Sequence, residues 1–316
     1  MLDTLANLFT AVHAWLFETL VQPALYQHGF MTYAEQAFSA LEVSLYGVLE
    51  IGLMLLLLRP LESWRPVERW QDRKAVRVDV LYTFLHRLGV VPLAVFLLLQ
   101  PLEQTIDGTL RLHGFIPPSL EELWPWLTTH PFASFCAYLA ILDFAEYWRH
   151  RLQHRFNWWW ALHALHHSQR QLSFWADRRN HLLDDVLSDL WVVLVALLIG
   201  VPPAYFLGIL VLTRLIESLS HTNVRLSFGR LGDRLLVSPH YHRQHHGIGV
   251  GHEGHAKGCN FAPLFPLWDL LFGTAHLVPD YPATGIRDQL NGVDYGEGFI
   301  RQQLLGIKRL TRALLP

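Results

Sequence analysis

Long apolar stretches separated by short polar segments dominate the first half of this chain. Residues 38–58, 78–100 and 132–148 are each about long enough to cross the hydrocarbon core of a membrane as a helix. Ionisable residues interrupt these stretches, including Glu50 in the first and Arg87 in the second. We expect each stretch to be a membrane-spanning helix.

A fourth apolar region has a break near its middle. Residues 186–199 and 204–219 are both apolar, and Pro202 and Pro203 lie between them. Proline lacks an amide donor and interrupts helices, so this pattern predicts a helical hairpin that enters the membrane and returns to the same side.

The distribution of positive charge predicts the orientation. Residues 59–77 contain six Lys and Arg residues, whereas residues 102–130 contain only Arg111. Loops rich in Lys and Arg stay on the cytoplasmic side, so residues 59–77 are expected inside and the third helix should return to the cytoplasm. We therefore expect an all-α, multi-pass membrane helical bundle with a cytoplasmic cap, in the inner membrane if the source is bacterial.

Composition narrows the function classes. The chain is 51% hydrophobic and only 16% charged, which is typical of a membrane protein, and its net charge of -2 offers no basic surface for nucleic acid. Its two cysteines, Cys136 and Cys259, are too far apart in sequence to suggest a disulfide framework or a thiolate zinc site. Histidine stands out instead, because 14 of the 19 histidines lie between residues 150 and 276.

These histidines occur at spacings that place them on one face of a helix. An HxxxH pair is followed by two HxxHH triplets, which comprise His150, His154, His163, His166, His167, His242, His245 and His246. Residues separated by three or four positions share a helix face. Eight clustered imidazoles would repel one another if protonated, whereas neutral imidazole is a common metal ligand. The pattern therefore favours a cytoplasmic, His-rich helical cap that binds metal.

The motifs also resemble a known family. The matching segments are residues 143–154 (DFAEYWRHRLQH), 160–168 (WALHALHHS), 238–247 (SPHYHRQHHG) and 267–274 (LWDLLFGT). They are similar to motifs of the fatty acid hydroxylase and sterol desaturase superfamily of membrane di-iron oxygenases. The likeness is greatest to the branch with alkylglycerol monooxygenase and bacterial sterol-desaturase-like proteins. We accordingly expect N-terminal membrane helices over 1–131, a catalytic domain over 132–276 and an amphipathic C-terminal tail over 277–316.

The resemblance implies two iron ions and O₂ as cofactors, although zinc could occupy the site in a purified sample, since nitrogen ligands suit both metals. It implies hydroxylation of a C–H bond in a membrane lipid, with desaturation or alkylglycerol ether cleavage by the same site as alternatives. His221 lies where some family members have a further metal ligand. A protein that stores or transports metal is a competing class, but its histidines would line the spanning helices.

Three further residues are candidates near the histidines. His181 could be a ligand or a donor to a ligand. Asp143 and Glu146 share a helix face with His150, and ionisable groups in a membrane helix are usually functional. We expect these carboxylates to orient imidazoles, the alternative being a hydrogen bond between helices.

Electrons and substrate are expected from outside the chain. We expect no nicotinamide, iron–sulfur or haem site in it, so the donor should be a ferredoxin, a cytochrome b5-like protein or a reduced pterin. A lipid should reach the histidines through an apolar corridor between the third helix and the hairpin, with walls that include Leu139, Leu142, Trp191, Val195 and Leu215.

Overall fold

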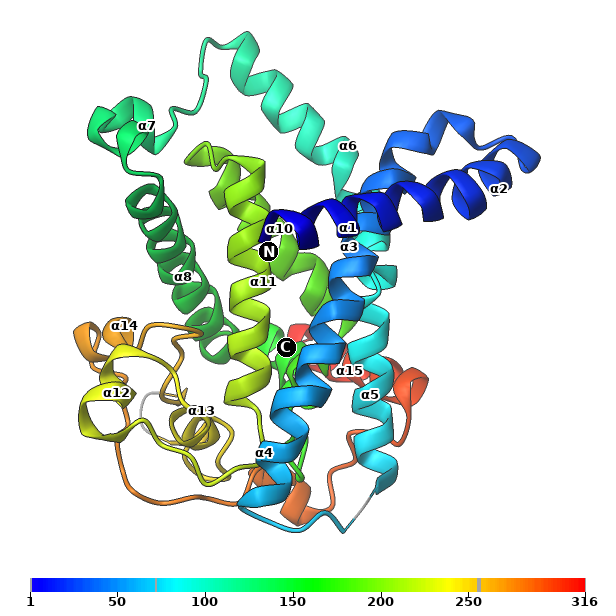
Figure 1. Cartoon of the computed structure of the whole chain (residues 1–316). Coiled ribbons are helices and arrows are strands. Elements are labelled where there is room, and N and C mark those ends of the chain that lie inside the picture. Colours follow the sequence, from blue (N-terminus) through cyan, green and yellow to red (C-terminus); the bar gives the residue numbers. More distant parts are fainter. Residues whose placement is uncertain (1, 72, 255–256, 316) are drawn as a thin grey trace.

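The computed structural model describes residues 2–71, 73–254 and 257–315. All regular elements over this part of the chain are helical, and a single isolated bridge pairs Gly247 with Thr284. Long helices form one half of the molecule, and the short helices between residues 229 and 271 gather at one end of them (Figure 1). The expected all-α architecture is therefore confirmed.

The N-terminal helices are α1 (Leu2–Leu16), α2 (Gln22–Gln27), α3 (Ala34–Leu53), α4 (Arg59–Trp64), α5 (Arg73–Arg87) and α6 (Val90–Leu112). The remaining ones are α7 (Leu120–Leu123), α8 (Pro131–Arg155), α9 (Asn157–His167), α10 (Leu182–Leu198), α11 (Pro203–Ser220), α12 (Gly229–Leu235), α13 (Pro239–His245), α14 (Leu267–Leu271) and α15 (Phe299–Leu314). The described residues also form short 3-10 or π segments: η1 (Phe17–Val21), η2 (Met31–Tyr33), η3 (Met54–Leu58), η4 (Pro125–Thr129), η5 (Ala176–Arg178) and η7 (Arg287–Asn291).

Among the described residues, three helical segments are long and apolar enough to cross a membrane, namely Met31–Trp64, Val90–Leu112 and Pro203–Ser220. The first and third contain the expected spans 38–58 and 204–219. The expected span 78–100 is wrong as a single helix, because Gly89 adopts a left-handed φ of 81° and separates α5 from α6. Residues 132–148 and 186–199 lie in α8 and α10, and their crossing of the membrane stays a prediction.

Buried ion pairs explain the charged residues that interrupt the apolar stretches. The guanidinium of Arg87 is fully buried and pairs with the carboxylates of Glu50 in α3 and Asp177 in η5, the latter at 2.8 Å. It also donates to Ser218 Oγ in α11 at 2.7 Å. Ionisable groups inside a membrane protein are costly unless they are paired, so Arg87 ties three parts of the bundle together.

Removing Arg87 should therefore destabilise the protein strongly. Arg87→Met leaves the buried carboxylate of Glu50 without its cation and that of Asp177 with only Arg178 at 3.8 Å, and we expect a loss of roughly 3–5 kcal/mol in unfolding free energy. The thermal midpoint of purified protein in mild detergent measures the effect. Arg111→Met is the matched control, because Arg111 forms an exposed pair with Asp107 and should change the midpoint little. Equal midpoints for both variants would contradict the structural role of Arg87.

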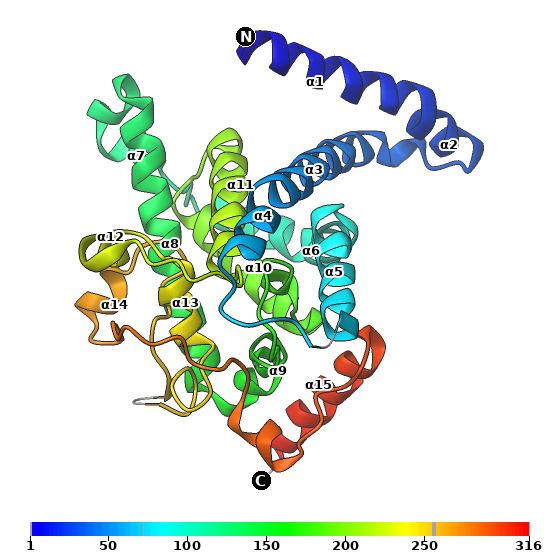
Figure 2. The same cartoon turned by 60° about the horizontal axis from the view of Figure 1, so that its bottom comes forward.

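The C-terminal helix α15 packs on one of the short helices that hold the histidines. It lies against α9 (Figure 2), where Arg309 Nε donates to the carbonyl oxygen of Ala161 at 3.1 Å. Gly306 approaches the ring of His181 so closely that a Cβ would overlap it. The amphipathic tail expected over 277–316 thus contains a helix that packs on the His-rich part of the fold.

Candidate metal centre

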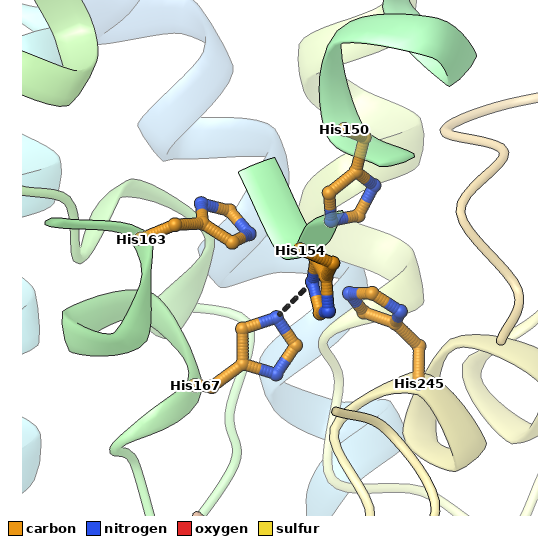
Figure 3. Close-up of side chains that lie close together, drawn as sticks. All are labelled: His150, His154, His163, His167 and His245. Carbon is orange, nitrogen blue, oxygen red and sulfur yellow. Dashed lines mark hydrogen bonds between the residues drawn. The ribbon is translucent and has the colours of Figure 1, made fainter. Parts of the chain in front are cut away.

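Nine histidines converge in two adjacent clusters. The five-histidine cluster comprises His150, His154, His163, His167 and His245, and its imidazole rings face one another (Figure 3). The four-histidine cluster comprises His166, His221, His242 and His246. In each cluster, one ring nitrogen from every residue lies within 4.8 Å of the others, and all nine residues are buried. The structure thus brings together all eight motif histidines and His221.

Four helices supply these side chains. His150 and His154 lie one turn apart at the end of α8, and His221 follows the last residue of α11. Helices α9 and α13 each contribute to both clusters, because their triplets cover a helix face wide enough to meet two centres. Across the junction, the rings of His167 and His246 stack with their centroids 4.4 Å apart.

Hydrogen bonds fix the tautomer of several rings. Nδ1 of His150, His245 and His221 donates to the backbone carbonyl oxygens of Phe261, Cys259 and Glu217, each at 2.7 Å. A carbonyl oxygen only accepts, so the proton must be on Nδ1, and Nε2 keeps a free lone pair. In His150 and His245, Nε2 is buried and has no hydrogen-bond partner among the described residues. Such orphaned nitrogens fit metal ligands.

Close contacts between ring nitrogens also support metal ligation by these histidines. In the four-histidine cluster, Nε2 of His221 lies 3.2 Å from Nε2 of His166 and 3.1 Å from that of His242. Nε2 of His246 lies 3.1 Å from that of His242. Two nitrogens bound to one ion at about 2.0–2.1 Å, at right or tetrahedral angles, would be roughly 3.0–3.4 Å apart. The residues therefore fit a metal ion in each cluster.

The electrostatic environment keeps these rings neutral. Burial in the protein, followed by the proximity of the other imidazoles, lowers the pKa of His166, His167, His242 and His246 well below the ordinary value of 6.5. Burial also lowers the pKa of His245 to about 3. A neutral imidazole can donate its lone pair to a metal, so the lowered pKa values favour ligation.

These pKa shifts predict that acid destabilises the metal-free protein. Below pH 6.5 the unfolded chain binds protons on histidines that remain neutral in the folded state, so unfolding becomes more favourable as the pH falls. Each such histidine contributes up to about 1.4 kcal/mol per pH unit. The thermal midpoint of metal-free protein should be nearly flat above pH 7 and fall steeply between pH 6.5 and 5. A midpoint that does not change over that acidic range would contradict the buried, neutral state.

His181 lies outside both clusters, and the ligand role expected for it is not supported. Its Nδ1 accepts a hydrogen bond from the backbone N–H of Leu183 at 3.1 Å, and its Nε2 lies 2.9 Å from the carbonyl oxygen of Gln303. Both ring nitrogens are therefore used to begin α10 and to hold α15. His181 contacts no clustered imidazole through a hydrogen bond either.

Asp143 and Glu146 also differ from expectation, because neither carboxylate is hydrogen-bonded to an imidazole. Asp143 accepts from the backbone N–H of Leu264 at 3.0 Å and from Trp268 Nε1 at 2.8 Å, which fastens the segment before α14 to α8. Glu146 forms an ion pair with Arg149 at 2.6 Å. For Asp143 the alternative role, a hydrogen bond between helices, is confirmed, because Asp143 in α8 accepts from Trp268 in α14.

Asp184 orients an imidazole, which is the role expected for Asp143 and Glu146. It was not among the residues predicted from the sequence. Its Oδ2 accepts from Nδ1 of His163 at 3.0 Å. Its Oδ1 accepts from Gln153 Nε2 at 2.7 Å and Trp159 Nε1 at 2.8 Å. The available signal was a pair of acidic residues, Asp184 and Asp185, in the first turn of an otherwise apolar helix.

A cavity of about 330 Å³ joins both clusters to the long helices α6, α8, α10 and α11. It lies between the third helix and the hairpin, as the corridor was expected to, but its walls differ. Leu142 lines it, whereas Val195 packs beside the apolar core of α8 and α11. Leu139, Trp191 and Leu215 are likewise absent from its lining among the described residues, and Val192 and Val193 line it from α10 instead. On α10 the lining residues thus lie within one helical turn of the residues that were expected to line the corridor.

Comparisons with known proteins agree with this geometry. Residues 135–274 match the fatty acid hydroxylase family model. Ornithine lipid hydroxylase OlsE of Rhizobium tropici is 30% identical over 236 residues, which are 71% of this chain and 65% of that protein. Alkylglycerol monooxygenase of Homo sapiens is 29% identical over 167 residues, which are 53% of this chain and 35% of that protein. No solved structure matches significantly.

The chain thus spans less than two thirds of the length of these relatives. Alkylglycerol monooxygenase of Caenorhabditis elegans is 28% identical over 151 residues, which are 48% of this chain and 27% of that protein. The family match nevertheless contains every one of the nine clustered histidines and the carboxylate of Asp184. Residues 135–274 of this chain are therefore similar to the fatty acid hydroxylase family over the segment that holds both clusters.

Proposed function

We propose that this protein is an integral-membrane oxygenase that hydroxylates a C–H bond of a lipid. The observation that carries the proposal is the pair of adjacent, all-histidine clusters at the end of a cavity lined by long helices. The family match and the two lipid-modifying relatives support the same reaction class. Desaturation and ether cleavage need the same histidines and remain the alternatives.

The histidines would hold two iron ions, one in each cluster. Bound iron would supply O₂ activation there, whereas zinc fits the same nitrogen ligands but has no redox chemistry. His150, His163 and His245 would offer Nε2 to the first ion, and hydrogen bonds from their Nδ1 atoms hold these rings in position. His221 would offer Nε2 to the second ion in the same way. Burial of all nine rings excludes bulk water from the site.

The reaction needs an external reductant. Hydroxylation consumes one O₂, two electrons and two protons, and it yields the alcohol and one water. Gly249, Gly251 and Gly254 do match the glycine spacing of a dinucleotide-binding loop, but they follow helix α13 and lie in turns, whereas that loop connects a strand to a helix. We therefore propose that a ferredoxin, a cytochrome b5-like protein or a reduced pterin supplies the electrons.

The active site is proposed to lie on the cytoplasmic face. The loop after α4 packs against the segment that follows His221, since Asn223 Oδ1 accepts from the backbone N–H groups of Val67 and Glu68 at 3.2 Å. This loop belongs to the basic segment 59–77. Loops rich in Lys and Arg stay in the cytoplasm, so the histidines should share that side.

Comparing lipids of cells with and without the chain tests the proposed reaction. We expect membrane lipids that are heavier by one oxygen atom, and none of them in cells that express His242→Ala at the same level. Desaturation would give lipids lighter by two hydrogen atoms, and ether cleavage would deplete alkyl lipids. An unchanged lipid profile with metal-loaded protein in the membrane would contradict all three reactions. Uptake of metal into proteoliposomes would favour the transporter class instead.

A further inference from the structure

Along three of the helices that line the cavity, the lining residues change from charged to apolar with distance from the histidines. Along α10 the lining residues are first acidic, Asp184, Asp185 and Asp189, and then apolar, Val192 and Val193. Because α10 leads away from the clusters, the apolar residues are the more distant ones. At a rise of about 1.5 Å per residue, Asp189 lies roughly 8 Å along the helix from Asp184, which contacts His163.

Helix α11 shows the same order from its other end. Its last lining residue is His221, a member of the four-histidine cluster, and Glu217 and Arg214 lie about one and two turns away. Leu210 and Phe206 follow at the far end. On α8, too, the charged Arg149 and Glu146 separate His150 from Leu142.

On α8, α10 and α11 the cavity therefore has a charged belt between the histidines and an apolar end, whereas on α6 the acidic Glu103 follows the apolar lining residues. We define the charged belt as Glu146, Arg149, Arg178, Asp185, Asp189, Arg214 and Glu217. A purely aliphatic chain that reached the histidines would place methylene groups against these charges and would strip them of hydration, which is unfavourable. The belt suits a polar group and the apolar end suits a hydrocarbon tail.

Most members of the charged belt neutralise one another. Arg149 pairs with Glu146 at 2.6 Å and donates to Ser188 at 3.0 Å. Arg178 pairs with Glu217, and Asp185 accepts from His86 at 3.0 Å. Each of these five residues thus has a direct partner without a ligand, although Nε of Arg178 forms no hydrogen bond in the described part of the chain.

Arg214 and Asp189 are different. Neither side chain forms an ion pair or hydrogen bond with any residue in the described part of the chain, and Nε of Arg214 is buried without a partner. They face the same cavity from α11 and α10. Each of the two charges interacts with the other and with Arg178 at longer range, but neither has a direct partner in the described part of the chain. A guanidinium and a carboxylate without direct partners are suited to ligand groups of opposite charge.

We propose that the charged belt binds the headgroup of a zwitterionic lipid, with its anionic group on Arg214 and its ammonium on Asp189. The tail then extends toward Val192, Val193 and Phe206, and the carbon presented to the histidines belongs to the headgroup side of the lipid. This inference rests on the proposed function and specifies its substrate class. The cavity volume accommodates a headgroup and the first part of a chain.

Binding of three lipids with the same acyl chain tests the recognition. The probes are lysophosphatidylethanolamine, which carries both charges, lysophosphatidic acid, which carries only the anion, and a neutral monoacylglycerol. Binding is measured on purified, metal-loaded protein in nanodiscs. Wild-type protein should bind the zwitterionic lipid most tightly and the neutral lipid most weakly.

The variants separate the two charges. Arg214→Gln should weaken binding of both phosphate-containing lipids roughly tenfold to hundredfold, and Asp189→Asn should weaken only that of the ethanolamine lipid by a similar factor. Neither change should alter monoacylglycerol binding, the thermal midpoint or the metal content. Arg230→Gln, on the exposed surface of α12, is the matched control. Equal binding of all three lipids, or phosphate-lipid binding that Arg214→Gln leaves intact, would overturn the proposal.

The position of the new oxygen gives an independent readout. Fragmentation of the lipid product should place it on the headgroup side. Oxygen on a distal tail carbon would overturn the headgroup inference while leaving the oxygenase function standing. Charge-selective binding without oxidation of any lipid would refute the oxygenase function while leaving the headgroup site standing.

Discussion

His245→Ala should abolish lipid turnover and release the metal ion of the five-histidine cluster, and His242→Ala should do the same for the four-histidine cluster. Each side chain is buried and directs a ring nitrogen toward its neighbours, so the alanine variant loses a ligand that no other residue replaces. Each variant should retain one ion per chain, against two in the wild type. Metal analysis of the purified proteins and a turnover assay measure both effects.

His276→Ala is the control for these two variants. His276 lies outside both clusters, and only its backbone is hydrogen-bonded, to Asn260. It should retain both ions and full activity. If His245→Ala or His242→Ala keeps full activity and two ions, that residue is not a ligand.

Asp184→Asn should weaken metal binding and turnover about tenfold to hundredfold, the usual loss when the hydrogen-bond partner of a metal-bound histidine is changed. The carboxylate holds His163 through Nδ1 and also receives Gln153 and Trp159. Asparagine keeps the size of the side chain but removes its charge and one acceptor oxygen. Competition with a chelator measures the metal affinity.

Asp143→Asn is the matched comparison for Asp184→Asn. Asp143 is equally buried and accepts as many hydrogen bonds, yet none comes from an imidazole. We expect this variant to lower the thermal midpoint and to leave the metal affinity unchanged. The same metal affinity in both variants and the wild type would show that Asp184 does not position His163.

Much of the metal centre could be predicted because helix periodicity is a local property. The spacing of His163, His166 and His167 fixes their common face in any helix, and a second triplet with the same spacing identifies its partner. His221 could also be predicted, since the hairpin returns its end to the side from which it entered. The division into five and four ligands depends on how α9 and α13 pack, and the spacing does not contain that information.

The residues whose roles differed from expectation also depend on how the helices pack. Asp184 and Asp143 are both acidic residues near histidines, and only the packing of α9 against α10 brings Asp184 to the imidazole of His163. For His181 the sequence left open a ligand and a donor to a ligand, and its position at the start of α10 could not be read from its residue type. The break at Gly89 allows Arg87 to turn toward Glu50, a distant partner that the apolar pattern cannot reveal.

Turnover under isotopically heavy O₂ is the most direct test of the proposal that the histidine clusters support lipid hydroxylation. Purified, iron-loaded protein is mixed with membrane lipid and a chemical reductant under the labelled gas, and the lipid product is analysed by mass spectrometry. We predict one heavy oxygen atom in each product molecule and no product without the reductant. A product whose new oxygen comes from water, or iron-loaded protein that consumes no O₂ with lipid and reductant present, would contradict the proposal.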